Sequence, residues 1–415
     1  MSFATGLICR ECGTAYPGEA RYVCDFCFGP LEVSYDLAAA QGVVTRSSIQ
    51  EGPLSIWRYG ALLPDPGEAP VDLGAGWTPL RRATRLAEVL GVRELWLKDD
   101  TRNPTGSFKD RVVSVALSSA RRLGFTTAAC ASTGNLATSV AAHAAFIGWP
   151  SVTIIPSDLE KSKIAMTAIF GGTVLGVDGS YDDVNRLCVE LAAEHPDWAF
   201  ANINVRPYYA EGSKTLAFEI AEQLGWRTPA QVVVPLASGS QFTKVAKGFN
   251  QFIELGLVEG DAPVLFGAQA TGCSPIATAH ASGAKVVTPQ RPHTIARSLA
   301  IGNPADGPYV LDALRASGGD CGSVSDEETL ECIELLARTE GVFAETAGGV
   351  TIASLRQLIN KGSINPNESI VAIISGHGLK TLDAIVDTAT VSSTISPSLA
   401  AAEEALRFHQ LVATS

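Results

Sequence analysis

Short runs of apolar residues alternate with longer segments of helical periodicity from about residue 93 onward. Uninterrupted apolar runs of this kind are typical of strands that are buried on both faces of a parallel sheet. The expected strands are "ELWLK" (Glu94–Lys98), "TAACAS" (Thr127–Ser132), "SVTIIP" (Ser151–Pro156), "GTVLGVD" (Gly172–Asp178), "QVVVPL" (Gln231–Leu236), "VLFGAQA" (Val264–Ala270) and "SIVAIISG" (Ser369–Gly376). The alternation predicts an α/β architecture with right-handed crossovers, and it is too extensive for a single sheet.

Helices are expected between these strands. After Asp110, apolar residues return at helical spacing as far as Gly124, which can end the helix. The other amphipathic segments are Tyr181–Glu194, Glu211–Leu224, Gln241–Leu255, Asp326–Thr339 and a last helix near the C-terminus. We therefore expect two α/β domains. Open α/β sheets bind ligands at the carboxyl ends of their strands, so the strand-to-helix turns are where a site is expected.

Composition and charge narrow the function. The chain has 415 residues, of which 46% are hydrophobic and 18% charged, as is typical of a globular protein. Its formal net charge is −12 without a long basic run, which argues against nucleic-acid binding as the main function. We see neither a secretory signal nor a transmembrane segment, and the cysteines outside the N-terminal segment are scattered singly. We therefore expect a cytoplasmic protein that does not contact membranes.

The stretch "NPTGSFKDR" (Asn103–Arg111) places Lys109 directly after a turn and at the start of the expected helix. The positive end of the helix dipole lies there and disfavours the ammonium form of the side chain. A neutral amine can attack a carbonyl and form a Schiff base. The alternative is an ordinary solvated lysine, which the position alone does not exclude.

Two further turns are suited to bind an anion, because backbone N–H groups gather at the helix start that follows each of them. The first consists of Ser132, Thr133, Gly134 and Asn135, and the second of Ala237, Ser238, Gly239, Ser240 and Gln241. The side chains of the first turn could instead serve only as a helix N-cap. The second turn is a typical phosphate cradle, but it has the pattern of neither an ATP-binding nor an NAD-binding loop.

A fourth turn, Ser375-Gly376-His377-Gly378, ends a late buried strand. Its glycines let the backbone approach a planar group closely, and Ser375 adds a hydroxyl. His377 could act as an acid or base, but a histidine between two glycines is more often structural. An activatable lysine, a phosphate cradle, an asparagine and a late hydroxyl together match the aldehyde, phosphate, phenolic oxygen and ring nitrogen of pyridoxal phosphate.

These motifs, together with "EGSKTLAFEIAEQLG", make the sequence from about residue 75 to 385 resemble the threonine synthase family of the tryptophan-synthase-β-like (fold type II) pyridoxal phosphate enzymes. The resemblance implies two three-layer α/β domains. The large cofactor-binding domain would comprise residues 37–115 and 212–415, with residues 116–211 inserted as a small domain. Residues 1–36 precede the resemblance, and their cysteines, described below, predict a zinc-ribbon-like segment. We expect the chain to form a homodimer.

The resemblance also implies residue roles. Lys109 would bind the cofactor as a Schiff base beside Phe108, Asn135 would bond the phenolic oxygen, and Ser375 would face the pyridine nitrogen. The loop Ala237–Gln241 would bind the cofactor phosphate. The residues expected to bind substrate are Ser132, Thr133, Asn204 and Arg206. The family pattern has an arginine shortly before the Glu-Gly pair, where this chain has Tyr208-Tyr209-Ala210, so Arg206 is the nearest cation. The alternative for Arg206 is an ion pair at the surface or between domains.

The implied reaction converts O-phospho-L-homoserine and water to L-threonine and phosphate by γ-elimination and β-addition. Related activities stay open: a cysteate synthase acting on phosphoserine, or an enzyme like threonine dehydratase. A regulatory protein that uses the same fold without catalysis is a further alternative.

The N-terminal segment contains two C-x-x-C pairs, formed by Cys9, Cys12, Cys24 and Cys27. Two such pairs can complete a tetrahedral zinc site, and four cysteine ligands leave no position open for catalysis. We therefore predict a structural zinc, with two disulfides as the alternative. No basic cluster surrounds the segment, which argues against a nucleic-acid role.

Overall fold

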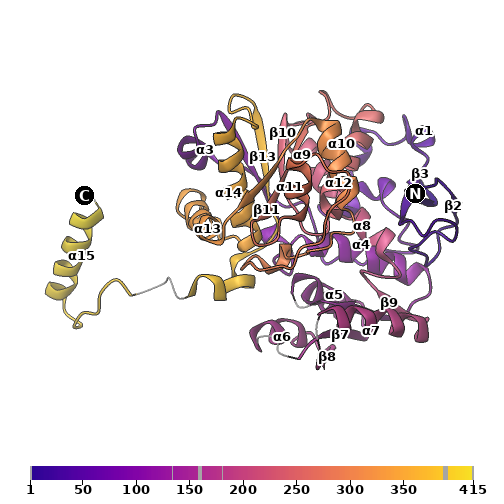
Figure 1. Ribbon diagram of the computed structural model, residues 1–415, viewed down its shortest axis with the longest axis horizontal. Coiled ribbons are helices and arrows are strands. Elements are labelled where there is room, and N and C mark those ends of the chain that lie inside the picture. The colour runs from indigo at the N-terminus through magenta and orange to yellow at the C-terminus, as the bar shows by residue number, and fades with distance from the viewer. Residues whose placement is uncertain (1, 133, 158–160, 180, 387–390, 414–415) are drawn as a thin grey trace. The chain divides into compact units, whose positions relative to one another are not determined.

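The computed structural model describes residues 2–132, 134–157, 161–179, 181–386 and 391–413 (Figure 1). The chain divides into two compact units, Met1–Lys380 and Thr381–Ser415. The second unit contains the expected C-terminal helix, α15 (Leu399–Ala413). In the part of the chain that is described, none of the helices has the length and apolar composition of a membrane span.

The larger sheet of the first unit has the strand order β12-β11-β10-β13-β5-β4. Its strands are β4 (Leu80–Arg82), β5 (Glu94–Asp99), β10 (Gln231–Pro235), β11 (Val264–Ala270), β12 (Cys321–Val324) and β13 (Ser369–Ile374). Neighbouring strands are parallel except for the edge pair β4 and β5. The apolar runs of the sequence thus form the central strands, as predicted, because only strands covered on both faces can bury so many consecutive side chains.

Helices cover both faces of this sheet. On one face lie α9 (Lys214–Gln223), α10 (Ser240–Glu254), α11 (Pro275–Ala281) and α12 (Gly307–Ser317), and on the other α3 (Thr84–Leu90), α13 (Asp326–Glu340) and α14 (Thr346–Lys361). Because side chains alternate along a strand, Val232 and Val234 of β10 pack in the first core and Val233 packs in the second. Figure 1 shows the two groups of helices on opposite sides of β10, β11 and β13.

A second, smaller sheet has the order β8-β7-β6-β9, with all neighbours parallel. Its strands are β6 (Thr127–Ala131), β7 (Ser151–Pro156), β8 (Thr173–Val177) and β9 (Trp198–Phe200). Helices α4 (Lys109–Arg122) and α5 (Asn135–Phe146) cover one face and α7 (Tyr181–Glu194) covers the other, while α6 (Lys161–Ala168) lies between β7 and β8 in sequence. The elements of this sheet lie together in Figure 1.

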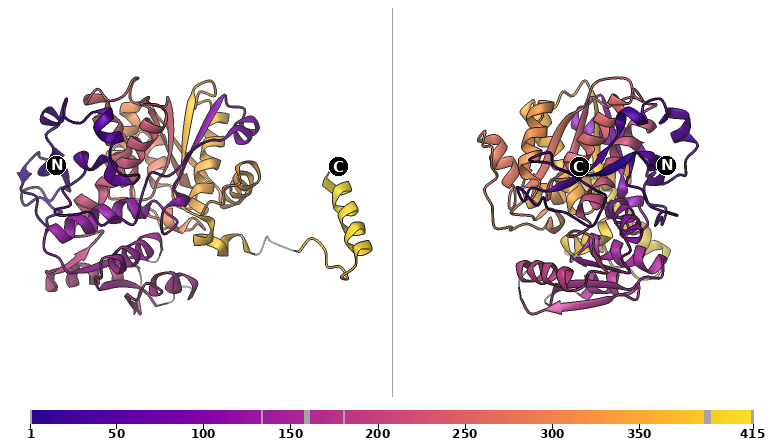
Figure 2. Two further views of the ribbon diagram at one scale, coloured as in Figure 1. Left: turned by 180° about the vertical axis from the view of Figure 1, so that it is seen from behind. Right: turned by 90° about the vertical axis from the view of Figure 1, so that its right-hand side faces the viewer.

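The N-terminal segment forms a three-stranded antiparallel sheet of β1 (Ala4–Cys9), β2 (Ala15–Tyr16) and β3 (Leu31–Tyr35). Its apolar face packs against α4 and α8 (Arg206–Glu211), in a core that includes Leu7 and Val33. Figure 2 shows this segment, in indigo, next to the rest of the first unit. Charged contacts add to this core, because Glu32 of β3 accepts a 2.7 Å hydrogen bond from Lys244. The remaining short helices are α1 (Leu37–Ala40), α2 (Arg46–Gln50), η1 (Ile56–Leu62), η2 (Asp100–Arg102), η3 (Arg297–Leu299) and η4 (Gly378–Ala384).

The predicted α/β class with two layered sheets is confirmed. The four strands of the smaller sheet all fall within the predicted inserted domain, residues 116–211, and the ribbon strands fall within residues 1–36. The exact domain boundaries stay predictions, and the predicted large domain does not separate Thr381–Ser415, which forms a unit of its own. The sequence pattern missed β4, β9 and β12, because these strands are three or four residues long.

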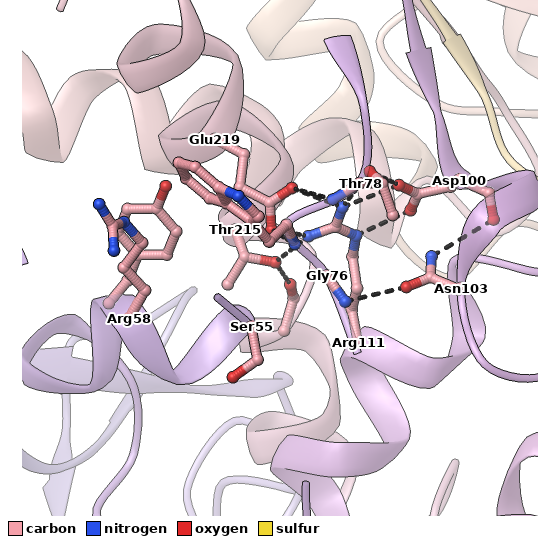
Figure 3. Close-up of polar contacts among 12 residues, drawn as sticks. Ser55, Arg58, Gly76, Thr78, Asp100, Asn103, Arg111, Thr215 and Glu219 are labelled. Carbon is pink, nitrogen blue, oxygen red and sulfur yellow. Dashed lines mark hydrogen bonds and ion pairs between the residues drawn. The ribbon is translucent and has the colours of Figure 1, made fainter. Parts of the chain in front are cut away.

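A buried ionic network lies beneath the start of α4 (Figure 3). Arg111, Asp100 and Glu219 are each fully buried. The Arg111 guanidinium donates two hydrogen bonds to Asp100, at 2.7 and 2.8 Å, and a further one to Glu219 at 2.8 Å. Lys98 of β5 adds a 2.6 Å ion pair to Glu219. The network therefore joins the end of β5, the first turn of α4 and the middle of α9.

Burial alone would raise the pKa of Glu219, but Arg111 and Lys98 outweigh it and lower the pKa to about 2. In an unfolded chain the pKa of a glutamate is about 4.3, which is about 2 units higher than that of folded Glu219. The contribution of Glu219 to stability is therefore fully present above pH 4.3 and is lost as the pH falls toward 2.

We predict that Glu219→Gln lowers the free energy of unfolding by about 3–5 kcal/mol at neutral pH, because it leaves buried cations without a counter-charge. The loss should shrink as the pH falls toward the acid limit, where the wild-type side chain is also neutral. Urea unfolding followed by circular dichroism between pH 3 and pH 7 measures both effects. Glu254→Gln, at an exposed position of α10, is the matched control and should change stability by less than about 0.5 kcal/mol. A similar loss in both variants would contradict the prediction.

Candidate active site

Three of the four predicted turns lie at one edge of the larger sheet. The turn before Lys109 follows β5, the turn at Ser375 follows β13, and the loop Ala237–Gln241 follows β10. Strands β10, β13 and β5 are adjacent and parallel, so their carboxyl ends meet at the same edge. The sequence argument placed a ligand site at this edge.

The turn before Lys109 is stabilised by Asp110, the residue that directly follows the lysine. Gly106 has a positive φ of 77°, and its N–H donates to the carbonyl of Asn103 at 2.8 Å. The carboxylate of Asp110 accepts from the backbone N–H of Thr105 at 2.7 Å and from its hydroxyl at 2.8 Å. Asp110 thus closes the turn that precedes Lys109.

Two turns from different strands pair with each other through their backbones. The N–H of Phe108 donates to the carbonyl of Ser375 at 2.8 Å, and the N–H of His377 donates to the carbonyl of Gly106 at 2.8 Å. This pairing fixes Lys109 beside Ser375. The Nδ1 of His377 accepts from the N–H of Leu379 at 3.1 Å, a contact that favours the structural interpretation of the histidine.

The side chain of Lys109 is half-buried between two aromatic rings. Its Nζ donates a 2.9 Å hydrogen bond to the hydroxyl of Tyr209, on α8. The same nitrogen lies 4.6 Å from the ring centroid of Phe108 and 5.5 Å from that of Tyr209. Sequence reasoning placed Phe108 beside the lysine but missed Tyr209. The only local signal for Tyr209 was its place two residues before the Glu211-Gly212 pair.

A carboxylate that sequence reasoning did not single out lies between two predicted residues. Glu345, at the N-terminus of α14, is 2% exposed. It accepts a 2.8 Å hydrogen bond from Nδ2 of Asn135 and a 3.4 Å bond from the hydroxyl of Ser375. Gly376 is required here, because a Cβ on it would lie 2.5 Å from the carboxylate. An acidic residue inside the apolar stretch "VFAETAGG" was the signal that could have identified Glu345.

Burial raises the pKa of Glu345, while the bond from Asn135 and the charges of Lys380 and Lys109 partly oppose the shift. Asn135 is the first residue of α5, which covers the smaller sheet. Glu345 directly precedes α14, which covers the larger sheet. The carboxylate therefore joins the fourth predicted turn to the three turns of the larger sheet.

The loop Ala237–Gln241 has the features of an anion cradle. Gly239 precedes α10 with a φ of 95°, and no side chain caps the first turn of the helix. A Cβ on Gly239 would lie 2.6 Å from Val310, so a larger residue does not fit. The Nε2 of Gln241 is buried and has no hydrogen-bond partner among the described residues. Uncapped N–H groups and an unpaired amide donor fit a bound phosphate.

The residues predicted to bind substrate have local contacts in the structure. Ser132 accepts a 3.4 Å bond from the N–H of Gly134, and Thr133 lies outside the described residues. Asn204 uses both ends of its amide on backbone groups of Phe200 and Trp198, each at 2.9 Å. Their roles in substrate binding stay predictions.

Arg206 forms a 2.9 Å ion pair with Asp306, which also pairs with Arg10 of the N-terminal ribbon at 2.9 Å. This is the linking ion pair that the sequence left open as its alternative role. The N–H of Asp306 in turn donates to the carbonyl of Ser238 in the cradle, at 2.9 Å. The role of Arg206 in binding substrate also stays a prediction.

The four N-terminal cysteines lie together. The Sγ atoms of Cys9, Cys12, Cys24 and Cys27 are all within 4.8 Å of one another, and all four are free thiols. The alternative of two disulfides is therefore not what the structure has. Four sulfurs at this spacing suit a tetrahedral zinc ion.

Comparison with known proteins agrees with this geometry. Residues 71–376 match the family described as pyridoxal-phosphate dependent enzymes. The chain is 39% identical over 382 residues to a threonine synthase of Methanocaldococcus jannaschii, covering 91% of this chain and 93% of that protein. It is 38% identical over 403 residues to a threonine synthase of Methanosarcina acetivorans, covering 96% and 98%. This chain belongs to the family of pyridoxal-phosphate dependent enzymes, and the relatives that it matches over nearly their full length are threonine synthases.

Solved structures with lower identity share the fold. Diaminopropionate ammonia lyase from Escherichia coli matches with a TM-score of 0.64 at 19% identity, covering 83% of this chain and 92% of that chain. Threonine deaminase isoform 2 from Solanum lycopersicum matches with a TM-score of 0.63 at 22% identity, covering 75% and 83%. The predicted fold of the cofactor-binding domains is thereby confirmed.

The burial of Glu345 can be tested on the cofactor-free protein, because its raised pKa makes the stability of the protein depend on pH. The fold favours the neutral carboxyl, so its contribution to stability is full below the unfolded pKa near 4.3 and is lost as the pH rises through the higher folded pKa. Glu345→Gln does not titrate. Its free energy of unfolding should therefore improve relative to wild type as the pH rises from 4.5 to 8, as measured by urea unfolding. A constant difference between the two proteins over this range would contradict the assignment.

Proposed function

We propose that this chain is a threonine synthase that converts O-phospho-L-homoserine and water to L-threonine and phosphate. The observation that carries the proposal is the 38–39% identity to threonine synthases over nearly the whole length of both chains. The half-buried lysine between two aromatic rings and the uncapped helix N-terminus of the same sheet edge support it.

The residues present fit pyridoxal phosphate. The cradle Ala237–Gln241 would hold its phosphate, since the buried amide donor of Gln241 has no partner among the described residues. Lys109 would bind the cofactor through its aldehyde carbon. Asn135 would form a hydrogen bond with the phenolic oxygen, and Ser375 would form one with the ring nitrogen. When bound, the cofactor supplies an aldehyde that captures amines and a conjugated ring that withdraws electrons from the α-carbon of the substrate.

The protein's own groups would then bind, orient and move protons. Once the amine of the substrate has replaced that of Lys109, the lysine Nζ could accept the α-proton and then a β-proton as phosphate leaves from the γ-carbon. It could return protons to the γ-carbon and, after water has added at the β-carbon, to the α-carbon. The rings of Phe108 and Tyr209, whose centroids lie 4.6 and 5.5 Å from this nitrogen, would help to orient it. Ser375, a neutral hydroxyl, does not enforce a charged pyridine ring as a carboxylate would, although Glu345 lies behind it at 3.4 Å.

The setting of the enzyme is part of the proposal. We propose that it acts in the cytoplasm on a small-molecule substrate, as a homodimer and without nucleic acid. The nine free cysteines support a reducing compartment, and the net charge of −12 argues against a nucleic-acid partner. Size-exclusion chromatography with light scattering would test the dimer.

The reaction can be tested by product identification with O-phospho-L-homoserine as the sole substrate. We predict that the purified protein releases L-threonine and phosphate in equal amounts, measured by amino-acid chromatography and a phosphate assay. Phosphoserine should give no product, and L-threonine should give no keto acid. Turnover of phosphoserine alone would favour a cysteate synthase, and keto-acid release from threonine would favour a dehydratase. A protein without any turnover or bound cofactor would favour a regulatory use of the fold.

Lys109→Ala is the variant that accompanies this test. It should lose the visible absorption of the bound cofactor and reduce turnover at least about 1,000-fold, because both nucleophile and base are removed. Lys285→Ala, at an exposed lysine, is the matched control and should behave as wild type. Circular dichroism would show whether both variants are folded, and full activity in folded Lys109→Ala would contradict the lysine assignment.

We also propose that Cys9, Cys12, Cys24 and Cys27 bind one structural zinc ion per chain. Mass spectrometry of the metal content should find about one zinc per chain in wild type and less than half as much in Cys12→Ser, because a tetrahedral site loses a ligand. Cys321→Ser removes a thiol outside the cluster and should retain the metal. Equal zinc in both variants, or none in wild type, would contradict this site.

A further inference from the structure

We propose that Tyr209 is a positioning residue for the reaction: its hydroxyl holds the amine of Lys109 in both of its protonation states. This inference rests on the proposed function, in which Lys109 has to be neutral at one stage and charged at another. The observation behind it is the 2.9 Å hydrogen bond from Lys109 Nζ to the Tyr209 hydroxyl.

The hydroxyl has both of the capacities that this role needs. A phenolic oxygen can accept a hydrogen bond from an ammonium, and its own O–H can donate to the lone pair of a neutral amine. The contact can therefore reverse its direction while the two atoms stay in place. No covalent bond of the tyrosine breaks and its hydroxyl keeps its proton. Lys109 alone therefore takes up and releases the protons of the reaction.

The other acceptors close to Lys109 are already in use. The carboxylate of Asp110 accepts from Thr105 and, at 2.6 Å, from the hydroxyl of Ser139. The carboxylate of Glu345 accepts from Asn135 and Ser375. An ionised carboxylate only accepts hydrogen bonds, whereas a phenolic hydroxyl can also donate one to a neutral amine.

Helix α8 is fixed firmly enough to keep Tyr209 in position. At its start, Arg206 is paired with Asp306 at 2.9 Å. At its end, the fully buried Glu211 is paired with Lys214 and Lys244, each at 2.7 Å. Helix ends held in this way leave Tyr209 little freedom to move, which is what a positioning group requires.

The test compares Tyr209→Phe with Tyr208→Phe. The second variant is the matched control, because the neighbouring hydroxyl donates to the carbonyl of Glu19 at 2.8 Å and does not reach Lys109. We expect Tyr209→Phe to lower kcat about 10- to 100-fold, as for the loss of a hydrogen bond to a charged group, with KM changed less than about threefold. We expect Tyr208→Phe to keep the wild-type kcat. A wild-type kcat in Tyr209→Phe, or equal losses in both variants, would overturn the proposal.

A second readout needs neither substrate nor cofactor. Trace acetylation of the cofactor-free protein by acetic anhydride, read by peptide mass spectrometry, compares the reactivity of Lys109 with that of the exposed Lys285. In Tyr209→Phe both protonation states lose their hydrogen bond, but the bond to the charged ammonium is the stronger of the two, and the neutral amine also loses the donor at its lone pair. We therefore expect the labelling ratio of Lys109 to Lys285 to rise at least about threefold. We expect Tyr208→Phe to leave it unchanged. An unchanged or lower ratio in Tyr209→Phe would overturn the inference.

The two readouts separate the inference from the proposed reaction. If wild type makes no threonine from O-phospho-L-homoserine, the proposed reaction fails whatever the labelling shows. If wild type makes threonine and either kcat or the labelling ratio does not respond to Tyr209→Phe, the role of Tyr209 fails and the reaction stands.

Discussion

The guanidinium of Arg111 is the constraint on which the site depends. It lies without solvent contact between Asp100 and Glu219, and Lys98 completes the balance of charge. Ions cannot be buried in this way unless every partner is present. The end of β5, the start of α4 and the middle of α9 therefore have to come together as one unit. Lys109 lies two residues before this arginine and takes its position from it.

Three consecutive residues at the start of α4 have three different tasks. Lys109 points toward Tyr209, Asp110 turns back to close the loop before it, and Arg111 enters the core. Successive side chains of a helix diverge by about 100°, so one turn of helix can serve a reactive site, a loop and a core at once. The strict order Lys-Asp-Arg in the motif thus has a separate physical reason at each position.

Local patterns were enough to predict the central strands of the two parallel sheets and the four turns, but not the short strands β4, β9 and β12. Apolar runs mark buried strands directly, and small or polar residues between a strand and a helix mark the turns. Tyr209 and Glu345 were not predicted. Tyr209 is not unusual within its own segment, and the acidic Glu345 stands out in an apolar stretch but without any indication of its partners. Tyr209 meets a side chain 100 positions away, and Glu345 meets one 210 positions away. Contacts of this kind depend on how two sheets come together, which periodicity does not encode. Arg206 was singled out for its charge, whereas its observed partner is Asp306.

The N-terminal ribbon is built into the rest of the first unit. Arg10 reaches Asp306, whose N–H binds the carbonyl of Ser238 in the cradle. Tyr35 donates a 2.8 Å hydrogen bond to the buried Glu211. A shortened chain that began after residue 36 would expose the apolar surface of α4 and α8 and would lose Glu32, one of the two carboxylates that pair with Lys244 and Lys247. The ribbon is therefore part of the packed first unit, and removing it would disturb the surroundings of α8 and of the cradle.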